Sequence, residues 1–214
     1  FNGTLPEFPA GKPLFIFASH FHADHYAPVI FQLGEKRENV FYILSKEIGK
    51  KIPEEYRKRY KDRIRLVKAG ERFCLNISEE SLIVETFHST DEGVAFWLSC
   101  EGKEIYHAGD LNNWWWEGED MAWNRNMAAS YKQEMKKLSG RTADLAFIPV
   151  DPRQEQWFYL GAAGFMEQAD AKWIFPMHFW EDYTIIPKLI EHPSSEGWRD
   201  RIVEIHKEGE EFIR

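Results

Sequence analysis

The sequence has little cysteine and no long apolar run, and these shortages exclude several classes of protein. Its two cysteines, Cys74 and Cys100, form no C-x-x-C pair, so neither a disulfide scaffold nor a redox motif is indicated. Both lie in apolar, strand-like runs, and we expect them to be small core residues. No stretch approaches about 18 consecutive apolar residues, so no transmembrane helix is predicted. The first residues, FNGTLPEFPAGKP, lack the features of a signal peptide. We therefore expect a cytoplasmic protein without a membrane partner.

Positively charged residues are outnumbered, with 27 Lys and Arg against 35 Asp and Glu. The formal net charge of the 214 residues is −8, whereas non-specific binding of nucleic acid needs an excess of cations. Basic residues are concentrated between Arg57 and Arg65, but acidic residues alternate with them nearby, which is typical of a solvated helix face. We therefore expect a small molecule as the partner and no nucleic acid. The sequence does not indicate an oligomeric state.

The remaining composition favours one packed domain over residues 1–214, because 43% of the residues are apolar and no linker or repeat divides the chain. Short apolar runs bounded by turn residues predict strands at Leu14–Ala18, Val40–Leu44, Ile64–Val67, Ser81–Thr86, Val94–Cys100, Glu104–Tyr106, Leu145–Val150 and Trp173–Phe175. Helices are predicted at Pro53–Arg63, 121–138 and 159–169. We interpret the apolar stripe along residues 121–138 as packing. The class is α/β or α+β.

One segment carries four potential metal ligands within six residues. His20 and His22 follow the first predicted strand, and Asp24 and His25 come directly after them. Residues two apart in an extended chain project to the same side, and a turn at Ala23 can direct the next pair elsewhere. A chance H-x-H-x-D-H pattern in such a chain is on the order of 1 in 1,000. Since imidazole and carboxylate groups suit zinc, the pattern predicts a metal site.

Six residues cannot complete two metal sites, so further ligands are expected downstream. Three candidates stand at the ends of strand-like runs, where loops gather and carry functional groups: His88, Asp110 and His178. Each of them alone is more often a hydrogen-bonded core or loop residue. The first cluster favours their interpretation as ligands.

The order H-x-H-x-D-H, then His, Asp and His, resembles the metallo-β-lactamase superfamily of metal-dependent hydrolases. Residues 19–26, 88–96 (HSTDEGVAF) and 106–116 (YHAGDLNNWWW) are most similar to small hydrolases of the branch that includes sugar-phosphate lactonases. The resemblance implies an α+β fold, a four-layered αββα sandwich with the metals at one edge. It also implies one or two strands before the histidine-rich segment. Because only about a dozen residues precede that segment's strand, we expect N-terminal strands to be missing or this edge to be open.

The resemblance further implies a ligand set for two zinc ions bridged by Asp110. One ion would be held by His20, His22 and His88, and the other by Asp24, His25 and His178. Manganese or iron can occupy sites of this type. The diiron flavoprotein branch usually has glutamate where this chain has His22, so this residue favours hydrolysis.

A hydroxide shared by two zinc ions would attack an ester, lactone or amide-like bond of a small molecule. Asp110 and Asp24 are the catalytic candidates, the first as the bridge and the second as a group that orients the nucleophile. Two alternatives stay open: a phosphodiesterase acting on nucleotides or RNA, and a metal-binding protein without catalytic activity.

Weaker candidates lie near the predicted ligands. Residues that could contact the substrate are Trp114, Trp115, Asp151 and Arg153, which follow two of the predicted strands. A packed surface loop or a strand-end ion pair would also explain them. His107 precedes Asp110 by three residues, so it is a candidate for supporting the ligands from behind or for a place in the core.

Overall fold

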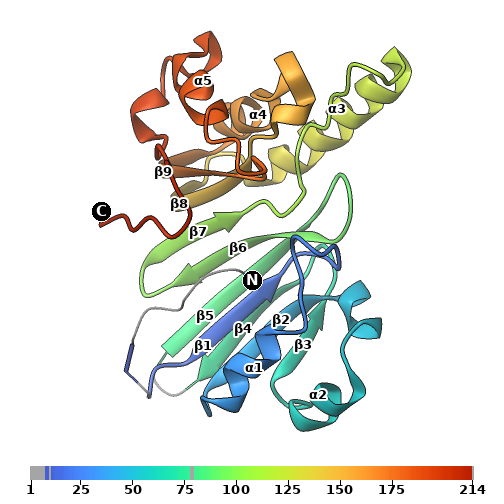
Figure 1. Ribbon diagram of the computed structural model, residues 1–214, viewed down its shortest axis with the longest axis vertical. Coiled ribbons are helices and arrows are strands. Elements are labelled where there is room, and N and C mark those ends of the chain that lie inside the picture. Colours follow the sequence, from blue (N-terminus) through green and yellow to red (C-terminus); the bar gives the residue numbers. More distant parts are fainter. Residues whose placement is uncertain (1–7, 10, 78–79, 214) are drawn as a thin grey trace.

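The computed structural model describes residues 8–9, 11–77 and 80–213 and shows two β-sheets with helices on their outer sides (Figure 1). The small sheet is parallel and consists of β1 (Leu14–Ala18), β2 (Val40–Ser45) and β3 (Ile64–Val67), in that order. The large sheet has the order β4 (Arg72–Ile77), β5 (Glu80–His88), β6 (Val94–Cys100), β7 (Lys103–His107), β8 (Thr142–Pro149) and β9 (Asp170–Met177). It is antiparallel from β4 to β7 and parallel from β7 to β9.

The outer face of the small sheet packs against α1 (Ile30–Glu35) and α2 (Glu54–Arg59). Side chains along a strand alternate between its two faces, so Tyr42 and Leu44 of β2 lie in the cluster beneath these helices. The intervening Ile43 belongs to a different cluster, on the opposite face of the sheet.

The inner faces of the two sheets pack against each other. Ile43 and Val67 from the small sheet join Val84, Phe96 and Leu98 from the large sheet in one apolar cluster. The ring of Phe17 meets that of Phe96 edge to face, with centroids 5.2 Å apart. The two sheets therefore form the two central layers of the molecule.

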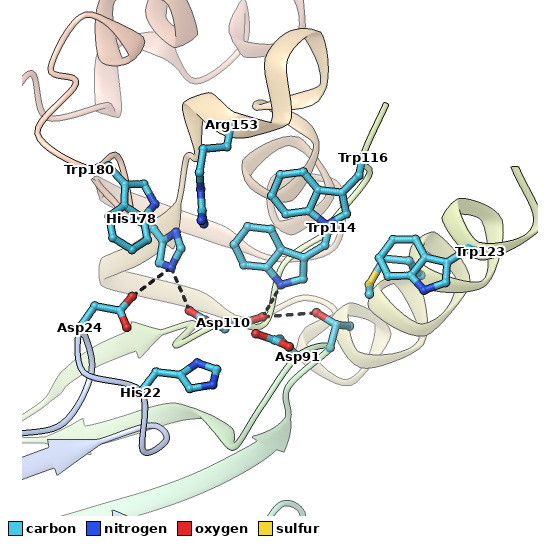
Figure 2. Close-up of a pocket in the computed structure, with 12 residues that line it drawn as sticks. His22, Asp24, Asp91, Asp110, Trp114, Trp116, Trp123, Arg153, His178 and Trp180 are labelled. Carbon is cyan, nitrogen blue, oxygen red and sulfur yellow. Dashed lines mark hydrogen bonds and ion pairs between the residues drawn. The ribbon is translucent and has the colours of Figure 1, made fainter. Parts of the chain in front are cut away.

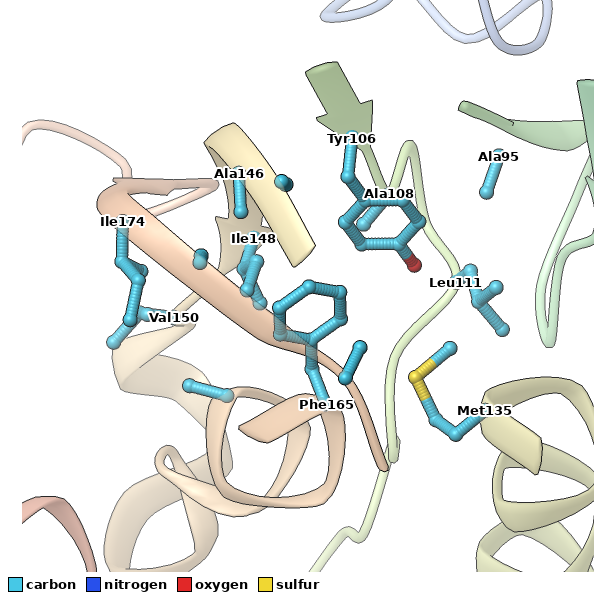
Figure 3. Packing of buried hydrophobic residues seen from close by; sticks show 14 of the residues in the cluster. Ala95, Tyr106, Ala108, Leu111, Met135, Ala146, Ile148, Val150, Phe165 and Ile174 are labelled. Carbon is cyan, nitrogen blue, oxygen red and sulfur yellow. The ribbon is translucent and has the colours of Figure 1, made fainter. Parts of the chain in front are cut away.

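The outer face of the large sheet packs against α3 (Met121–Met135), α4 (Leu160–Gln168) and α5 (Ile185–Glu191). Figure 3 shows Met135 of α3 and Phe165 of α4 in this apolar cluster. Tyr106 of β7 stacks on Phe165 of α4, with ring centroids 4.8 Å apart. Each of the three interfaces between neighbouring layers is thus filled by apolar side chains. This arrangement confirms the predicted α+β class and the αββα sandwich.

Each predicted strand corresponds to a strand of the structure, but one strand and two α-helices were not predicted. The strand β4 and the helices α1 and α5 span only six or seven residues each, and the sequence analysis did not identify them. The expectation that both cysteines lie in the core was wrong for Cys74, which is exposed on the edge strand β4, whereas Cys100 is half-buried and packs against the core between the sheets. Within the described part of the chain, no helix combines the length and the hydrophobicity that crossing a bilayer requires.

The fold brings the ends of several strands to one edge. Strands β7, β8 and β9 are parallel, so their carboxyl ends meet there, and Asp110, Asp151 and His178 follow them. β1 ends at the same edge, since the backbone N–H of Val94 in the large sheet donates to the carbonyl oxygen of Ser19, 3.0 Å away. Loops from both sheets therefore lie next to each other at this edge.

Candidate metal centre

Asp110 lies at the centre of a cluster of imidazoles and carboxylates. Its Oδ2 is 3.3 Å from Nε2 of His20, and its Oδ1 is 3.1 Å from Nε2 of His25. The two oxygens therefore face two different imidazoles. A carboxylate in this position can serve two cations, one on each oxygen.

A second group of ligand atoms joins Asp110 from the other side. Oδ2 of Asp24 lies 3.3 Å from Nε2 of His25 and 3.5 Å from Nε2 of His178. Figure 2 shows His178 facing both Asp24 and Asp110, and its Nε2 is 3.6 Å from Oδ1 of Asp110. One ligand atom from each of Asp24, His25 and His178 lies within 4.8 Å of the others. The structure therefore brings together the three residues that the resemblance assigned to one ion.

The ligands assigned to the other ion are only partly brought together. Nδ1 of His22 lies 3.0 Å from Nε2 of His20, so these two imidazoles converge beside Asp110. His88 does not join them: its side chain is exposed and lines a separate cavity beside Lys46 and Lys50. Asp91, which we did not predict, forms a third group with His22 and Asp110, again within 4.8 Å.

Two atoms at the centre of the cluster are buried without a hydrogen-bond partner among the described residues, Nε2 of His25 and Oδ1 of Asp110. Burying an unsatisfied polar atom costs about 1–3 kcal/mol. Both atoms point at each other and at the other ligands, and nitrogen and oxygen donors of these kinds bind zinc, manganese and iron. The residues present therefore fit a pair of divalent cations.

The charges of the site keep Asp110 ionised. Burial raises the pKa of this carboxyl group, but the close contacts of its oxygens with His20 and His25 and the positive potential of His25 and His178 outweigh it. The pKa of Asp110 is consequently well below its usual range. An ionised bridge of this kind is the form that binds cations.

Support for the imidazoles comes from Ser19 and Asp151. Oγ of Ser19 is 3.1 Å from Nδ1 of both His20 and His25, so the Nε2 atoms of both rings face Asp110. Asp151 is fully buried, and its Oδ2 lies 2.9 Å from Nδ1 of His178. Such contacts fix the tautomer and the orientation of a metal-binding histidine. Asp151 therefore supports His178 from behind and does not line the cavity, whereas Arg153 does.

The pKa values of this pair follow from their contact. Burial raises the pKa of Asp151, yet the hydrogen bonds with His178 and Arg153 outweigh it and lower the value to about 2. Burial lowers the pKa of His178, but the hydrogen bond with Asp151 and the nearby carboxylates raise it overall. His178 also has a φ of 64°, an uncommon conformation for a residue other than glycine. The strained backbone conformation therefore occurs at a residue whose imidazole is a candidate metal ligand.

The contact between Asp151 and His178 leads to a prediction for metal affinity. Asp151→Asn keeps the size of the side chain but removes the charge that holds the imidazole, so the affinity for one cation should fall about 10- to 100-fold. A competition titration with a fluorescent chelator measures this change. Asp144→Asn is the matched control, because Asp144 pairs with Lys172 elsewhere in the large sheet. Equal affinities in the two variants would contradict this role for Asp151.

A cavity of about 440 Å³ opens above the cluster (Figure 2). His22, Asp24, Asp91, Asp110 and His178 contribute to its lining, together with Thr90, Met127, Arg153 and four tryptophans, Trp114, Trp116, Trp123 and Trp180. The cavity therefore combines the candidate ligands with a wide aromatic wall.

The tryptophan wall corrects two sequence interpretations. Trp114 donates from Nε1 to the carbonyl oxygen of Asp110 at 2.9 Å and stacks parallel to Trp116. Trp115 does not line the cavity; its ring packs against that of Trp157, with centroids 5.3 Å apart. Trp123, at the start of α3, lines the cavity, although we interpreted the whole stripe of this helix as packing.

His107 lies next to the cluster without joining it. Its Nδ1 accepts a hydrogen bond from the backbone N–H of Gly109 at 3.1 Å, and its ring packs on Phe147. Burial, and secondarily the charge of His25, lower its pKa to about 4, so the imidazole is neutral. His107 thus supports the tight turn that leads to Asp110.

The chain combines four layers with candidate ligands that converge at the edge where the strands end. This is the four-layered αββα sandwich that the resemblance to the metallo-β-lactamase superfamily implies. No family model matches the sequence, and no curated protein matches it.

Solved structures resemble the chain at low sequence identity and with TM-scores below 0.5. The metallo-β-lactamase fold protein YhfI from Bacillus subtilis is 13% identical, with 88% of this chain and 72% of that chain covered and a TM-score of 0.46. Human tRNase Z, short form, is 15% identical, with coverages of 83% and 76% and a TM-score of 0.46. Zn²⁺-bound PqqB from Methylobacterium extorquens is 10% identical, with coverages of 78% and 62% and a TM-score of 0.43.

Proposed function

We propose that the chain is a hydrolase that uses two divalent metal ions, with zinc as the first candidate, to cleave an ester, lactone or amide-like bond of a small molecule. The observation that carries this proposal is the position of Asp110, whose two oxygens face two imidazoles below an open cavity. The cavity volume of about 440 Å³ is within the range of small-molecule sites.

The candidate ligands divide into two sets around Asp110. His20 and His22 would hold one ion, and Asp24, His25 and His178 would hold the other. When bound, such a pair supplies a hydroxide at neutral pH and polarises the oxygen of the attacked bond. The contribution of the chain is to hold these ligands in fixed positions through Ser19 and Asp151, so that little reorganisation accompanies the reaction.

Asp24 is the residue best placed to handle a proton. Its side chain is 38% exposed and lines the cavity, whereas Asp110 is almost completely buried. Its Oδ2 faces His25 and His178, so the carboxylate reaches both the ligand cluster and the substrate space. We propose that Asp24 orients the attacking water and accepts its proton.

Arg153 and the tryptophans would position the substrate. The guanidinium of Arg153 lies 4.6 Å from the ring centroid of Trp180 and 5.8 Å from that of Trp116, and it binds Asp151 through Nε and Nη2. A planar guanidinium held in this way suits a carboxylate or phosphate group. We propose that the substrate carries such an anionic group and an apolar part that packs on Trp114 and Trp116.

Chelation of the purified protein tests the proposed function. Turnover of lactone, thioester and bis-p-nitrophenyl phosphate substrates is compared before chelation, after it, and after Zn²⁺ or Mn²⁺ is returned. We expect hydrolysis of a carboxylic ester or lactone that falls about 100-fold or more without metal and recovers with it.

The other outcomes separate the alternatives. Turnover of the phosphodiester alone would favour a phosphodiesterase. Bound metal with no turnover of any substrate would favour a non-catalytic metal-binding protein. Hydrolysis that persists unchanged after complete removal of the metal would contradict the proposal.

A further inference from the structure

The loop between β5 and β6 presents a carboxylate to the cluster. Asp91 lies in this loop, and one of its oxygens is within 4.8 Å of a ligand atom of His22 and of an oxygen of Asp110. Figure 2 shows these three side chains together at the floor of the cavity. His88, the residue that the resemblance assigned to this ion, is the last residue of β5 directly before this loop.

The local structure explains why His88 and the cluster are separated. His88 is the last residue of β5 and pairs with Val94 of β6, so its position is set by the strand register. Its backbone N–H donates to Glu134 of α3 at 3.2 Å, which holds this end of the strand. Its side chain is exposed in the cavity that Lys46 and Lys50 line. These contacts fix the main chain of His88, and its side chain lines a cavity to which His20, His22 and Asp110 do not contribute.

The residues that follow His88 are hydrogen-bonded to the loop that carries Asp110. Oγ1 of Thr90 donates to the carbonyl oxygen of Asn112 at 2.6 Å, and it accepts from the backbone N–H of Asn112 at 3.0 Å. The backbone N–H of Asp91 donates to Oγ of Ser89 at 3.2 Å. These contacts place Asp91 beside Asp110, whose Oδ1 is buried without a hydrogen-bond partner among the described residues.

We propose that Asp91, and not His88, completes the metal site of His20, His22 and Asp110. The inference rests on the proposed function, because it requires that the cluster binds two cations. Each ion would then have two imidazoles and two carboxylates, with Asp110 shared: His20 and His22 with Asp91 for one, and His25 and His178 with Asp24 for the other. Replacing an imidazole by a carboxylate makes the site harder, which favours Mn²⁺ relative to a site with three histidines.

Metal stoichiometry tests the inference without relying on activity. The wild-type protein, Asp91→Asn, Asp91→His and His88→Ala are each loaded with Mn²⁺ or Zn²⁺, desalted, and measured by mass spectrometry of the metal. We expect two ions per chain in the wild type and in His88→Ala, and about one in Asp91→Asn. Asp91→His should recover the second ion and retain Zn²⁺ better than Mn²⁺.

The possible results separate the role of Asp91 from the proposed function. Two ions in Asp91→Asn, or a loss of one ion in His88→Ala, would overturn the role of Asp91 while leaving the proposed function intact. A wild-type protein that binds no metal would overturn both. Thermal unfolding of every variant shows whether a lost ion reflects a lost fold, and Asp91→His then separates the two causes, because it restores a ligand at the same position.

Discussion

Asp110→Asn is expected to lower kcat/KM by about 10³-fold, because groups that only support a metal ligand already contribute 10- to 100-fold. Asparagine offers a neutral oxygen to one imidazole partner and an amide nitrogen to the other, so it cannot bridge two cations. Steady-state kinetics on the substrate found by the screen measures the loss, and metal analysis should show fewer bound ions.

The variant retains the shape of the side chain, so the fold should persist, as circular dichroism and thermal unfolding can show. Asp62→Asn is a suitable control, since Asp62 is an exposed aspartate after α2. A kcat/KM for Asp110→Asn within tenfold of the wild type would refute the bridging role.

Gly93→Ala is expected to reduce the free energy of unfolding by about 2–4 kcal/mol and to weaken metal binding. Gly93 has a φ of 74°, and a Cβ there would lie 1.9 Å from the carbonyl oxygen of Ser19 and 2.6 Å from Cβ of His20. The expected loss combines a left-handed backbone with overpacking against the main chain. Because Ser19 and His20 must move away, the geometry around His20 should change as well.

Gly102→Ala separates the two contributions in the Gly93 variant. Gly102 has a similar φ of 71°, but a Cβ there would meet no atom within 4 Å. Its substitution should cost only the backbone part, about 1–2 kcal/mol, and should not affect metal binding. Chemical denaturation of both variants provides the comparison. If Gly93→Ala lost no more stability than Gly102→Ala, the close approach of the two sheets at Ser19 would not matter energetically.

Sequence patterns located most of the elements that position the site. The apolar run before His20 and the run before His178 are strands because β-branched and aromatic residues occur there between polar breaks, and such patterns depend on short stretches of chain. The ligand motif also lies in short stretches. Its members converge because parallel strands end at one edge, which the structure shows for β7, β8 and β9.

The direction of loop side chains could not be predicted. Spacing does not show that His88 stays with the strand register while Asp91, three residues later, turns toward Asp110. The three consecutive tryptophans illustrate the same limit, since Trp114 and Trp116 line the cavity and Trp115 packs on Trp157. In both cases contacts with distant segments decide the orientation, and a local pattern carries no information about them.

Helical periodicity has a related limit at α3. It correctly indicates a continuous apolar face, and Tyr131 and Met135 on that face are buried in the core. Trp123 and Met127 extend the face beyond the sheet and line the cavity instead. The supporting roles of Ser19 and Asp151 were missed for another reason: each depends on a contact between residues whose partners and distances only the folded chain reveals.

The most direct test of the metal centre is anomalous diffraction from crystals of the protein loaded with Zn²⁺ or Mn²⁺. Data collected at the absorption edge should show two strong peaks per chain, one on each side of the Asp110 carboxylate. One peak should lie within coordination distance of His20 and His22, and the other within that of Asp24, His25 and His178. Anomalous maps from fully loaded crystals with no peak at Asp110 would contradict the account.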